Sequence, residues 1–289
     1  MVRPIAFAVP GDLNAPTGGY AYDRRMIHEL EQIGWHVEVL NLGEGFPWPS
    51  DETRTRAEAL LLAVPNGDTI VIDGLAFGVL PSAGLNLRAN HPVIALVHHP
   101  LALESGFSAQ QIVTLRDSER AALAAATRVV VTSGATARCL AADYGVPKEH
   151  IVVAPPGVDR APTARGNVDG VIQVLSVGAV VPRKGYDVLV ASLATLSELP
   201  WHLSIAGNLR ADPETASALE KDIARFRLGA RITLFGAGRR PVLPNFMRTR
   251  MYSCSLRVSR AMASRMQKYD RRCDPRHRAG RRWYTCFTK

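Results

Sequence analysis

Hydrophobic residues along the first 238 positions fall into two alternating patterns. Short, nearly continuous apolar runs predict strands of a parallel sheet, because such strands are buried on both faces. Between them lie longer segments whose apolar residues recur at helical spacing. Regular alternation of strands and helices predicts an α/β fold with doubly wound parallel sheets. The first strands are expected at 5–9, 36–40, 69–73, 93–98, 128–132 and 151–154, and the helices at about 20–33, 53–63, 79–89, 109–126 and 135–144.

A stretch rich in Pro and Gly interrupts this pattern after residue 154. Pro155, Pro156 and Gly157 begin a polar run that extends to Gly170, which is typical of an interdomain linker. The pattern then resumes, with strands expected at 171–177, 201–206 and 231–235 and helices at about 185–196 and 213–226. We therefore expect two Rossmann-like sheets, with a cleft between their facing strand ends.

The pattern ends after Gly238. Among the last 51 residues only four are Val, Leu or Ile, and neither the strand period nor the helix period persists. Such a segment buries too little apolar surface to offset the entropy of ordering. We expect an incomplete second domain over 171–238, with about three strands, and an aberrant, disordered tail over 239–289. The tail is interpreted as an out-of-frame translation or, alternatively, as a genuine basic tail.

The basic charge of the chain is concentrated in this tail. The whole chain has a formal net charge of +9, but residues 239–289 hold 15 basic and 2 acidic residues, and the rest holds 20 basic and 24 acidic. The globular part is thus mildly acidic, so the overall charge does not by itself indicate a nucleic-acid partner. A hydrophobic fraction of 47% is ample for a buried core.

Cysteine usage and the N-terminus indicate the compartment. Cys139 is the only cysteine outside the tail, which favours a reducing environment, and the tail cysteines lack metal-ligand spacing. The N-terminal apolar stretch is too short for a signal peptide, and no apolar run is long enough to span a membrane. We expect a cytoplasmic protein.

Two adjacent cations follow the strand at 171–177. In a strand–helix unit, ligands bind beyond the carboxyl end of the strand and beside the helix N-terminus. Arg183 and Lys184 lie in that loop. A charge-assisted hydrogen bond from either to a diphosphate would contribute about 1.5–3 kcal/mol. Elsewhere such a pair would be interpreted as solvated surface, but this context favours an anion site.

A pair of glycines precedes the first helix. Gly18 and Gly19 would let the backbone approach a ligand closely, with amide groups directed at it. Their spacing matches neither a dinucleotide fingerprint nor a P-loop. An ordinary flexible turn is therefore an equal alternative.

Two histidines close the fourth expected strand. His98 or His99 could hydrogen-bond a substrate hydroxyl or stabilise developing charge. Adjacent strand residues point to opposite faces, so at most one is expected to serve. The alternative is a strand-end histidine that bonds to backbone. Metal binding is not expected, because no further His, Cys or carboxylate cluster is paired with them in the sequence.

Several segments together resemble one family. They are GGY before the first helix, VHHP after the fourth strand, VVVTSGAT, IVVAPPGVD, and LSVGAVVPRKGYDVLVASLATL with LSIAG. These segments are similar to the pattern of glycosyltransferase family 4 (group 1), over about residues 4–238, and the RKG segment is the most specific. The resemblance implies the GT-B architecture of two Rossmann-like domains. It also implies transfer of a sugar from a nucleotide diphosphate donor with retention, without a metal or other cofactor.

The resemblance implies a role for each candidate. His98 would be the catalytic histidine beside the transferred sugar, with His99 as a second candidate. The donor diphosphate would be bound by Gly18, Gly19, Arg183 and Lys184. Ser133 and Thr136 lie in a region that borders the cleft in relatives, too weakly to assign a role.

The domains and partners follow from the same resemblance. Residues 1–154 would form the acceptor-side domain and 171–238 the nucleotide-sugar domain, joined by the linker 155–170. The enzyme would be a hexosyltransferase whose acceptor is a saccharide or a lipid-linked molecule, with peripheral membrane contact as an option and no specific nucleic acid. The family places a pair of glutamates at the donor sugar and ribose, yet residues 239–289 contain no glutamate. We therefore expect weak activity or none from this chain.

Two other functions fit the sequence less well. The chain could be a non-catalytic binding protein whose basic tail contacts nucleic acid or an anionic membrane, with a strongly salt-dependent affinity. An NAD oxidoreductase is a more distant alternative, because no Gly-x-Gly-x-x-Gly follows either leading strand.

Overall fold

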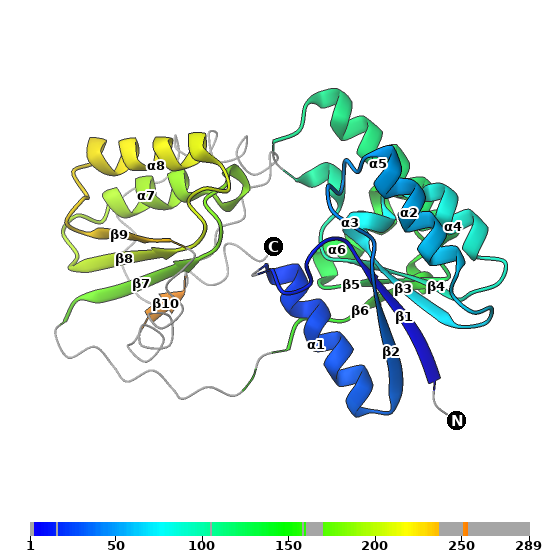
Figure 1. Ribbon diagram of the computed structural model, residues 1–289. Helices are drawn as coiled ribbons and strands as arrows, with labels where there is room; N and C mark the ends of the chain where they lie inside the picture. Colours follow the sequence, from blue (N-terminus) through cyan, green and yellow to red (C-terminus); the bar gives the residue numbers. More distant parts are fainter. Residues whose placement is uncertain are drawn as a thin grey trace. The chain divides into compact units, whose positions relative to one another are not determined.

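The computed structural model describes residues 3–15, 17–104, 106–157, 159, 170–236 and 251–253. The chain divides into two compact units, residues 1–159 and 160–289, each with one parallel sheet (Figure 1). Most of the expected linker at 155–170 lies outside the described residues. The expected disordered tail at 239–289 also lies outside them, except for 251–253.

The first unit contains a six-stranded sheet in the order β2-β1-β3-β4-β5-β6, and every pairing is parallel. The strands are β1 (Arg3–Val9), β2 (Trp35–Asn41), β3 (Thr69–Asp73), β4 (Val93–Val97), β5 (Arg128–Val131) and β6 (Ile151–Val153). The helices are α1 (Gly18–Gln32), α2 (Asp51–Leu62), α3 (Gly74–Phe77), α4 (Pro81–Leu87), α5 (Ala109–Ala125) and α6 (Gly134–Asp143), with 3-10 turns η1 (Leu101–Leu103) and η2 (Lys148–His150).

Alternating residues of β1 supply two separate hydrophobic cores. Ile5 and Phe7 pack in a cluster with Ile27 of α1. Ala6 and Ala8 belong to a larger cluster that includes residues of α2, α4, α5 and α6. Because successive strand residues point to opposite faces, the sheet is covered by helices on both faces. This explains the continuous apolar runs in the sequence.

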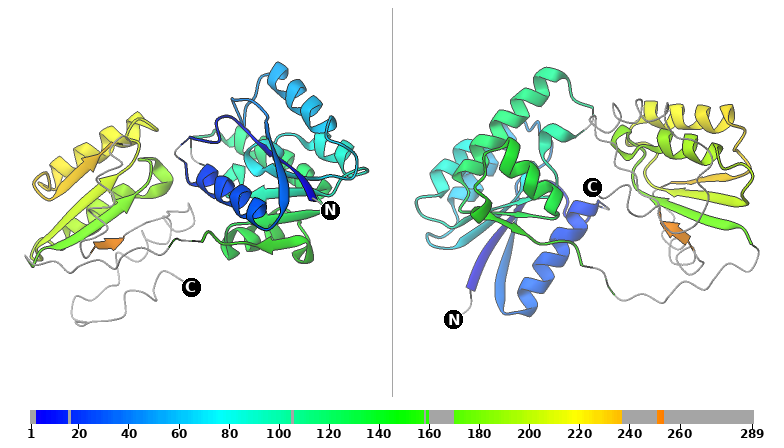
Figure 2. Two further views of the ribbon diagram at one scale, coloured as in Figure 1. Left: turned by 60° about the horizontal axis from the view of Figure 1, so that its bottom comes forward. Right: turned by 180° about the vertical axis from the view of Figure 1, so that it is seen from behind.

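The second unit contains a four-stranded parallel sheet in the order β10-β7-β8-β9. Its strands are β7 (Ile172–Val177), β8 (Trp201–Ala206), β9 (Ile232–Phe235) and β10 (Met251–Ser253). Its helices are α7 (Tyr186–Ala194), α8 (Pro213–Arg225) and the 3-10 turn η3 (Pro182–Lys184). Helices α7 and α8 lie side by side on one face of the sheet (Figures 1 and 2). Both units thus confirm the α/β class with Rossmann-like parallel sheets.

Two elements differ from the sequence-based expectation. The helix expected at about 79–89 is the shorter α4, which starts at Pro81, and an additional short helix, α3, precedes it because Asp73 caps a helical turn directly after β3. Strand β10 was not expected, since a three-residue segment carries no readable period. Its backbone pairs with β7, with Met251 opposite Gln173. The second sheet therefore has four described strands instead of about three.

Candidate active site

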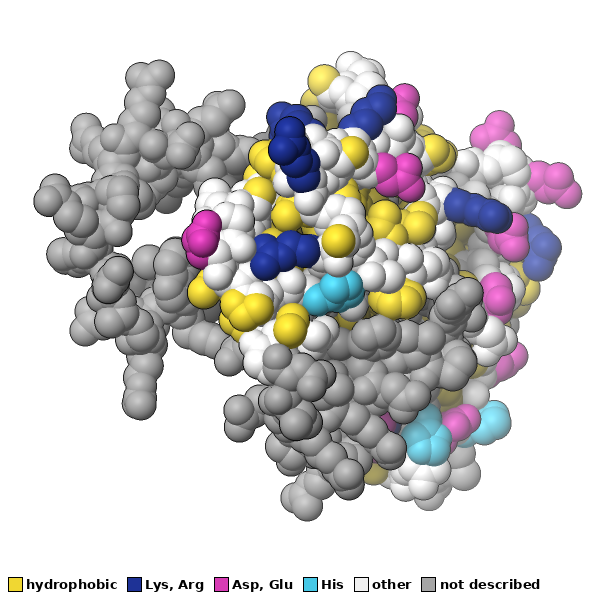
Figure 3. All heavy atoms as spheres, turned by 90° about the vertical axis from the view of Figure 1, so that its left-hand side faces the viewer, with side chains coloured by type: hydrophobic (Ala, Val, Ile, Leu, Met, Phe, Trp, Pro, Cys, Tyr) yellow, Lys and Arg dark blue, Asp and Glu magenta, His cyan; other side chains and the backbone are white. Residues whose placement is uncertain are grey.

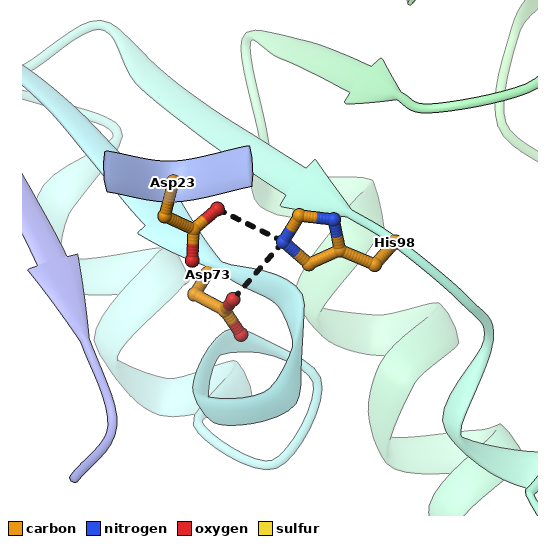
Figure 4. A group of neighbouring side chains, drawn as sticks. All are labelled: Asp23, Asp73 and His98. Atoms are coloured by element: carbon orange, nitrogen blue, oxygen red, sulfur yellow. Dashed lines mark hydrogen bonds and ion pairs between the residues drawn. The ribbon is translucent and has the colours of Figure 1, made fainter. Parts of the chain in front are cut away.

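A cluster of polar side chains lies where β3 and β4 end. Asp73 is the last residue of β3 and is only 2% exposed. Its Oδ1 accepts a hydrogen bond from the Leu75 amide at 2.7 Å and so caps α3. His98 directly follows β4, and the pairing of β3 with β4 brings it beside Asp73. The distance from His98 Nε2 to Asp73 Oδ2 is 3.4 Å (Figure 4).

The first helix contributes a second carboxylate to this cluster. Asp23 of α1 is completely buried, and its Oδ1 accepts a hydrogen bond from His98 Nε2 at 2.9 Å. Among the described residues, its Oδ2 has no hydrogen-bond partner. Helix α1 begins at Gly18 because the Thr17 hydroxyl accepts from the Tyr20 amide as an N-cap. This start of the helix places Asp23 one turn further on, facing the sheet.

The surroundings of the cluster shift the pKa values of His98 and Asp23. Burial alone would lower the pKa of His98, but its hydrogen bonds to Asp23 and Asp73 and their negative charges raise it to about 9. Burial raises the pKa of Asp23 to about 6, against the lowering effect of its hydrogen bond with His98. The raised pKa of His98 favours its protonated form at neutral pH.

One of the two predicted glycines forms part of the wall around His98. A Cβ added at Gly19 would lie 3.3 Å from His98 Cδ2, whereas one at Gly18 would meet nothing within 4 Å. The Tyr22 ring meets the imidazole edge-on, with 5.4 Å between centroids, and the Tyr22 hydroxyl donates to the Ala154 carbonyl at 2.8 Å. The sequence candidates Gly19 and His98 are thus brought together.

The other candidates of the first unit have different surroundings. His99 is half-buried and is not among the three clustered residues. The Ser133 hydroxyl accepts from the Thr136 amide at 3.1 Å and is the N-cap of α6, which is a structural task. Glu119 of α5 is 1% exposed, and its Oε2 accepts from the Leu101 amide at 2.9 Å. This bond ties the loop that follows His98 to α5.

The clustered atoms also have the spacing of metal ligands. One ligand atom each from Asp23, Asp73 and His98 lies within 4.8 Å of the others. The expectation that no carboxylates accompany the histidine was therefore wrong, because residues far apart in sequence meet here. Carboxylate and imidazole ligands suit several divalent ions. In this geometry, however, the same atoms are engaged with one another, because His98 Nε2 lies 2.9 Å from Asp23 Oδ1 and 3.4 Å from Asp73 Oδ2.

The second unit carries the predicted cations at the end of β7. Arg183 and Lys184 lie in η3, and both are half-buried. Gly185 follows in the left-handed conformation, with φ of 61°, and α7 begins after it. The Lys184 side chain folds back over Gly178, where an added Cβ would lie 3.3 Å from Nζ.

Two further contacts fix this loop. The Tyr186 hydroxyl donates to the Gly178 carbonyl at 2.9 Å. Gly207, after β8, lies so close that an added Cβ would be 1.8 Å from the same carbonyl oxygen. The loop after β7 is thus held by α7 and by the end of β8. Lys184 is thereby positioned at the carboxyl end of the strand, where the sequence predicted an anion site.

The sequence analysis did not predict three buried acidic residues, Asp23, Asp73 and Glu119, although each occupies a position in the sequence pattern that could have indicated it. Asp23 lies four residues before Ile27, and these two are the buried residues of α1, so it is a charge on the apolar stripe. Asp73 ends an apolar strand, which is where α/β sheets place functional groups. Glu119 lies four residues after the buried Leu115, again on a core-facing position.

This fold is shared with known glycosyltransferases. The family described as Glycosyltransferase Family 4 matches residues 71–161, a segment that includes Asp73 and His98. That match confirms the resemblance drawn from the sequence motifs. No curated protein sequence matches the chain.

Solved structures extend the likeness to both units. A lipopolysaccharide outer core galactosyltransferase, WaaB, in its apo form, is 15% identical with a TM-score of 0.59, over 83% of this chain and 70% of that chain. A glycosyltransferase from Rickettsia africae is 14% identical with a TM-score of 0.61, over 88% and 73%. Anabaena Alr3699/HepE in complex with UDP and glucose is 18% identical with a TM-score of 0.60, over 84% and 72%. At these identities the matches show the fold, which is of the GT-B type.

The surface and the helices add two observations. No helix of the described residues combines the length and the apolar character needed to cross a membrane.

On the face drawn in Figure 3, basic side chains of the described residues lie in several separate places among hydrophobic and uncharged ones.

Proposed function

We propose that this protein is a retaining, hexosyltransferase-type glycosyltransferase that moves a sugar from a nucleotide diphosphate donor to an acceptor hydroxyl. The match to Glycosyltransferase Family 4 and the GT-B fold support this proposal. HepE, which shares the fold, was crystallised with UDP and glucose and with UDP-glucose. The acceptor is a saccharide or a lipid-linked hydroxyl, and the protein acts in the cytoplasm, where Cys139 remains a free thiol.

The observation that carries the proposal is the loop that holds Arg183 and Lys184 after β7. Lys184 lies against Gly178, whose lack of a side chain lets the ammonium group lie close to the backbone at the carboxyl end of β7. Two positive groups at this point stabilise the negative charge that develops on the departing nucleotide diphosphate. This charge stabilisation takes the place of a metal ion in the proposed reaction.

In the first unit, His98 is the group proposed to meet the transferred sugar. His98 follows a central strand, and on one side of its imidazole ring lies Gly19, which has no side chain. The N-terminus of α1, with Gly18 and Gly19, adds backbone amides and a partial positive charge. Binding by fixed groups of this kind orients the donor for attack by the acceptor on the same face of the sugar.

Nucleotide binding tests the proposal directly. The affinities of the full chain and of Lys184→Ala for UDP and UDP-glucose are measured by isothermal titration calorimetry. Loss of one charge-assisted bond of about 1.5–3 kcal/mol predicts a dissociation constant roughly 10- to 150-fold higher in the variant. We measure binding instead of turnover because weak activity or none is expected. The resembling family places a pair of glutamates at the donor sugar and ribose, and residues 239–289 contain no glutamate.

Lys221→Ala is the matched control for this experiment. Lys221 is an exposed lysine of α8 in the same unit, far along the chain from the loop after β7. We expect this variant to bind UDP as the unmodified chain does. Equal affinity for UDP in Lys184→Ala and Lys221→Ala would contradict the proposed diphosphate site.

A further inference from the structure

The two carboxylates of the active-site cluster engage a single nitrogen of His98. Nε2 lies 2.9 Å from Asp23 Oδ1 and 3.4 Å from Asp73 Oδ2. Figure 4 shows that Nδ1 lies on the opposite edge of the ring, directed away from both carboxylates. The His98 side chain is 23% exposed, while the two carboxylate side chains are 0% and 3% exposed. The cluster thus has a buried acidic side and an accessible histidine side.

Asp23 has no structural task that explains its burial. Asp73 also caps α3, whereas the Asp23 carboxyl bonds to His98 through Oδ1 and otherwise lies beside Asp73, whose proximity raises the pKa of Asp23; by distance and angle its Oδ2 makes no hydrogen bond among the described residues. A buried polar atom without a partner typically costs about 1–3 kcal/mol. A carboxylate retained at such a cost is better explained by its effect on His98 than by stability.

The charges of the cluster indicate what the accessible side can bind. Two carboxylates and one imidazolium sum to one negative charge. A phosphate oxygen brought to the ring would be repelled by this excess charge in a partly buried site. A neutral hydroxyl, in contrast, can accept a hydrogen bond from a cationic N–H, and such a bond is stronger than a neutral one.

From this geometry, and resting on the function proposed above, we propose that Asp23 and Asp73 are positioning residues. They hold His98 as an imidazolium with Nε2 directed inward, so that the Nδ1–H is the donor that meets a hydroxyl of the transferred sugar. If His98 were neutral with its proton on Nε2, Nδ1 could only accept a hydrogen bond. The two carboxylates therefore decide whether Nδ1, the nitrogen directed away from them, donates or accepts.

The other titratable groups around the ring do not oppose this arrangement. From α1, burial raises the pKa of Tyr22, and burial together with Asp73 raises that of Tyr20 to about 12, so both phenols stay neutral. The carboxylates of Asp12 and Glu44, from the loops after β1 and β2, add to the shift of Tyr20 and carry the same sign as the buried pair.

Thr132 fixes the backbone of His98 rather than its charge. The Thr132 hydroxyl, directly after β5, donates to the His98 carbonyl at 3.3 Å. The ring is therefore oriented by its backbone, by Tyr22 and by the two carboxylates.

The protonation of His98 is tested by NMR on the full chain labelled with ¹⁵N-histidine, titrated with pH. At neutral pH both ring nitrogens of His98 are expected to show imidazolium shifts, with deprotonation only near the pKa of about 9. Asp23→Asn removes one negative charge without changing the shape of the side chain. It is expected to lower the proton affinity of His98 at least tenfold, and Asp73→Asn is expected to lower it as well.

Asp117→Asn is the matched control, because Asp117 is an exposed aspartate on α5 of the same unit. It should leave the His98 titration unchanged. A neutral His98 at neutral pH in the unmodified chain would overturn the proposal, and that measurement requires no variant to fold. An unaltered titration in a folded Asp23→Asn would overturn it too.

Binding separates this proposal from the proposed function. The ratio of UDP-glucose to UDP affinity reports the contribution of the sugar, and we expect it to fall about tenfold in Asp23→Asn. If the unmodified chain fails to bind UDP, the proposed function fails, although the titration can still show a positioned imidazolium. If UDP and UDP-glucose bind but Asp23→Asn leaves the ratio unchanged, the function stands and the positioning role is wrong.

A metal ion is the remaining alternative occupant of the cluster. The same NMR sample is titrated with Mg²⁺, Mn²⁺ and Zn²⁺. We expect no stoichiometric change at His98, because the proton on Nε2 occupies the place between the ligand atoms. Stoichiometric displacement of that proton by one of these ions would overturn the proposal and make the cluster a metal site.

Discussion

Gly19 lies against the imidazole ring of His98, so closely that a methyl group there would require the ring to move by a few tenths of an ångström. A Cβ at position 19 would be 3.3 Å from His98 Cδ2, closer than ordinary van der Waals contact. Gly19 lies in the first turn of α1, and Asp23 lies one turn later on the same helix. One helix therefore supplies both the surface beside the ring and a carboxylate that orients it.

Replacement of Gly19 by Ala should disturb the cluster, while the same change at Gly18 should not. In a helix, Ala is more stable than Gly by about 1 kcal/mol, so Gly18→Ala should raise the free energy of unfolding by up to that amount. In Gly19→Ala the new methyl group pushes the ring by a few tenths of an ångström and weakens its bond to Asp23. We expect this variant to gain no stability in urea denaturation.

The His98 resonances provide a second measurement for this pair. They should shift in Gly19→Ala and remain in place in Gly18→Ala, because a Cβ at position 18 meets nothing within 4 Å. Equal stabilisation by both changes, with unchanged His98 resonances, would show that the contact is looser than described.

Much of the fold could be predicted because the strands and helices follow from the local pattern of apolar and polar residues. The run Thr69–Asp73 is apolar up to its final carboxylate and is the strand β3. Candidate residues His98 and Lys184 were found because each follows a buried strand, which is a position defined by sequence order. Gly178 and Gly207 contact each other only through tertiary folding, so their close approach could not be predicted.

The cluster around His98 could be predicted only in part, because its members come together only in the folded chain. Its three members come from α1, β3 and β4, and strand order 1-3-4 in the sheet is what joins them. Nothing in the local pattern around Asp23 specifies which strand end it faces. Its burial follows from the helical stripe that it shares with Ile27, but its partner does not.

Gly207→Ala should destabilise the second unit severely. Its Cβ would lie 1.8 Å from the Gly178 carbonyl oxygen, so the ends of β7 and β8 would have to separate. Backbone against backbone cannot relax by a rotamer change, so we expect a loss of more than about 3 kcal/mol in the free energy of unfolding. Urea denaturation followed by tryptophan fluorescence, to which Trp201 on β8 contributes, measures it.

The control for this change is Gly229→Ala. A Cβ at Gly229 meets nothing within 4 Å, so the cost should be below about 1 kcal/mol. If Gly207→Ala proved as stable as Gly229→Ala, the close approach of the two loops would be wrong, and so would the position given to Lys184.

Glu119 should make the stability of the first unit decrease as the pH rises from mildly acidic to neutral. Burial raises the pKa of this carboxyl from 4.5 to about 7, so between these values the folded state binds more protons than the unfolded state. The free energy of unfolding should therefore fall as the pH rises from 4.5 to about 7. Glu119→Gln keeps an oxygen acceptor for the Leu101 amide and cannot ionise, so it should remove this contribution.

Glu119→Ala separates the bond from the charge. It leaves the Leu101 amide without its acceptor, which should cost about 1–3 kcal/mol at any pH. A Glu119→Gln variant that retained the full pH dependence of the unmodified chain would assign that dependence to another group.

His98 should give the first unit an alkaline limit of stability. Its pKa is raised from 6.5 to about 9, so its stabilising contribution is complete below pH 6.5 and is lost as the pH rises through about 9. A pKa rise of this size corresponds to at most about 3 kcal/mol, and the partial exposure of the ring lowers that figure through solvent screening. Urea denaturation at several pH values across this window measures the loss.

Asp23→Asn decides whether the carboxylates cause this limit. Without the buried charge His98 should titrate nearer its ordinary value, so the stability of Asp23→Asn should change less between pH 6.5 and about 9 than that of the unmodified chain. The variant is expected to be more stable than the unmodified chain at high pH, since it no longer buries a carboxylate beside a neutral imidazole. An unaltered alkaline slope in Asp23→Asn would mean that the charge on His98 does not depend on this carboxylate, and the imidazolium would need another explanation.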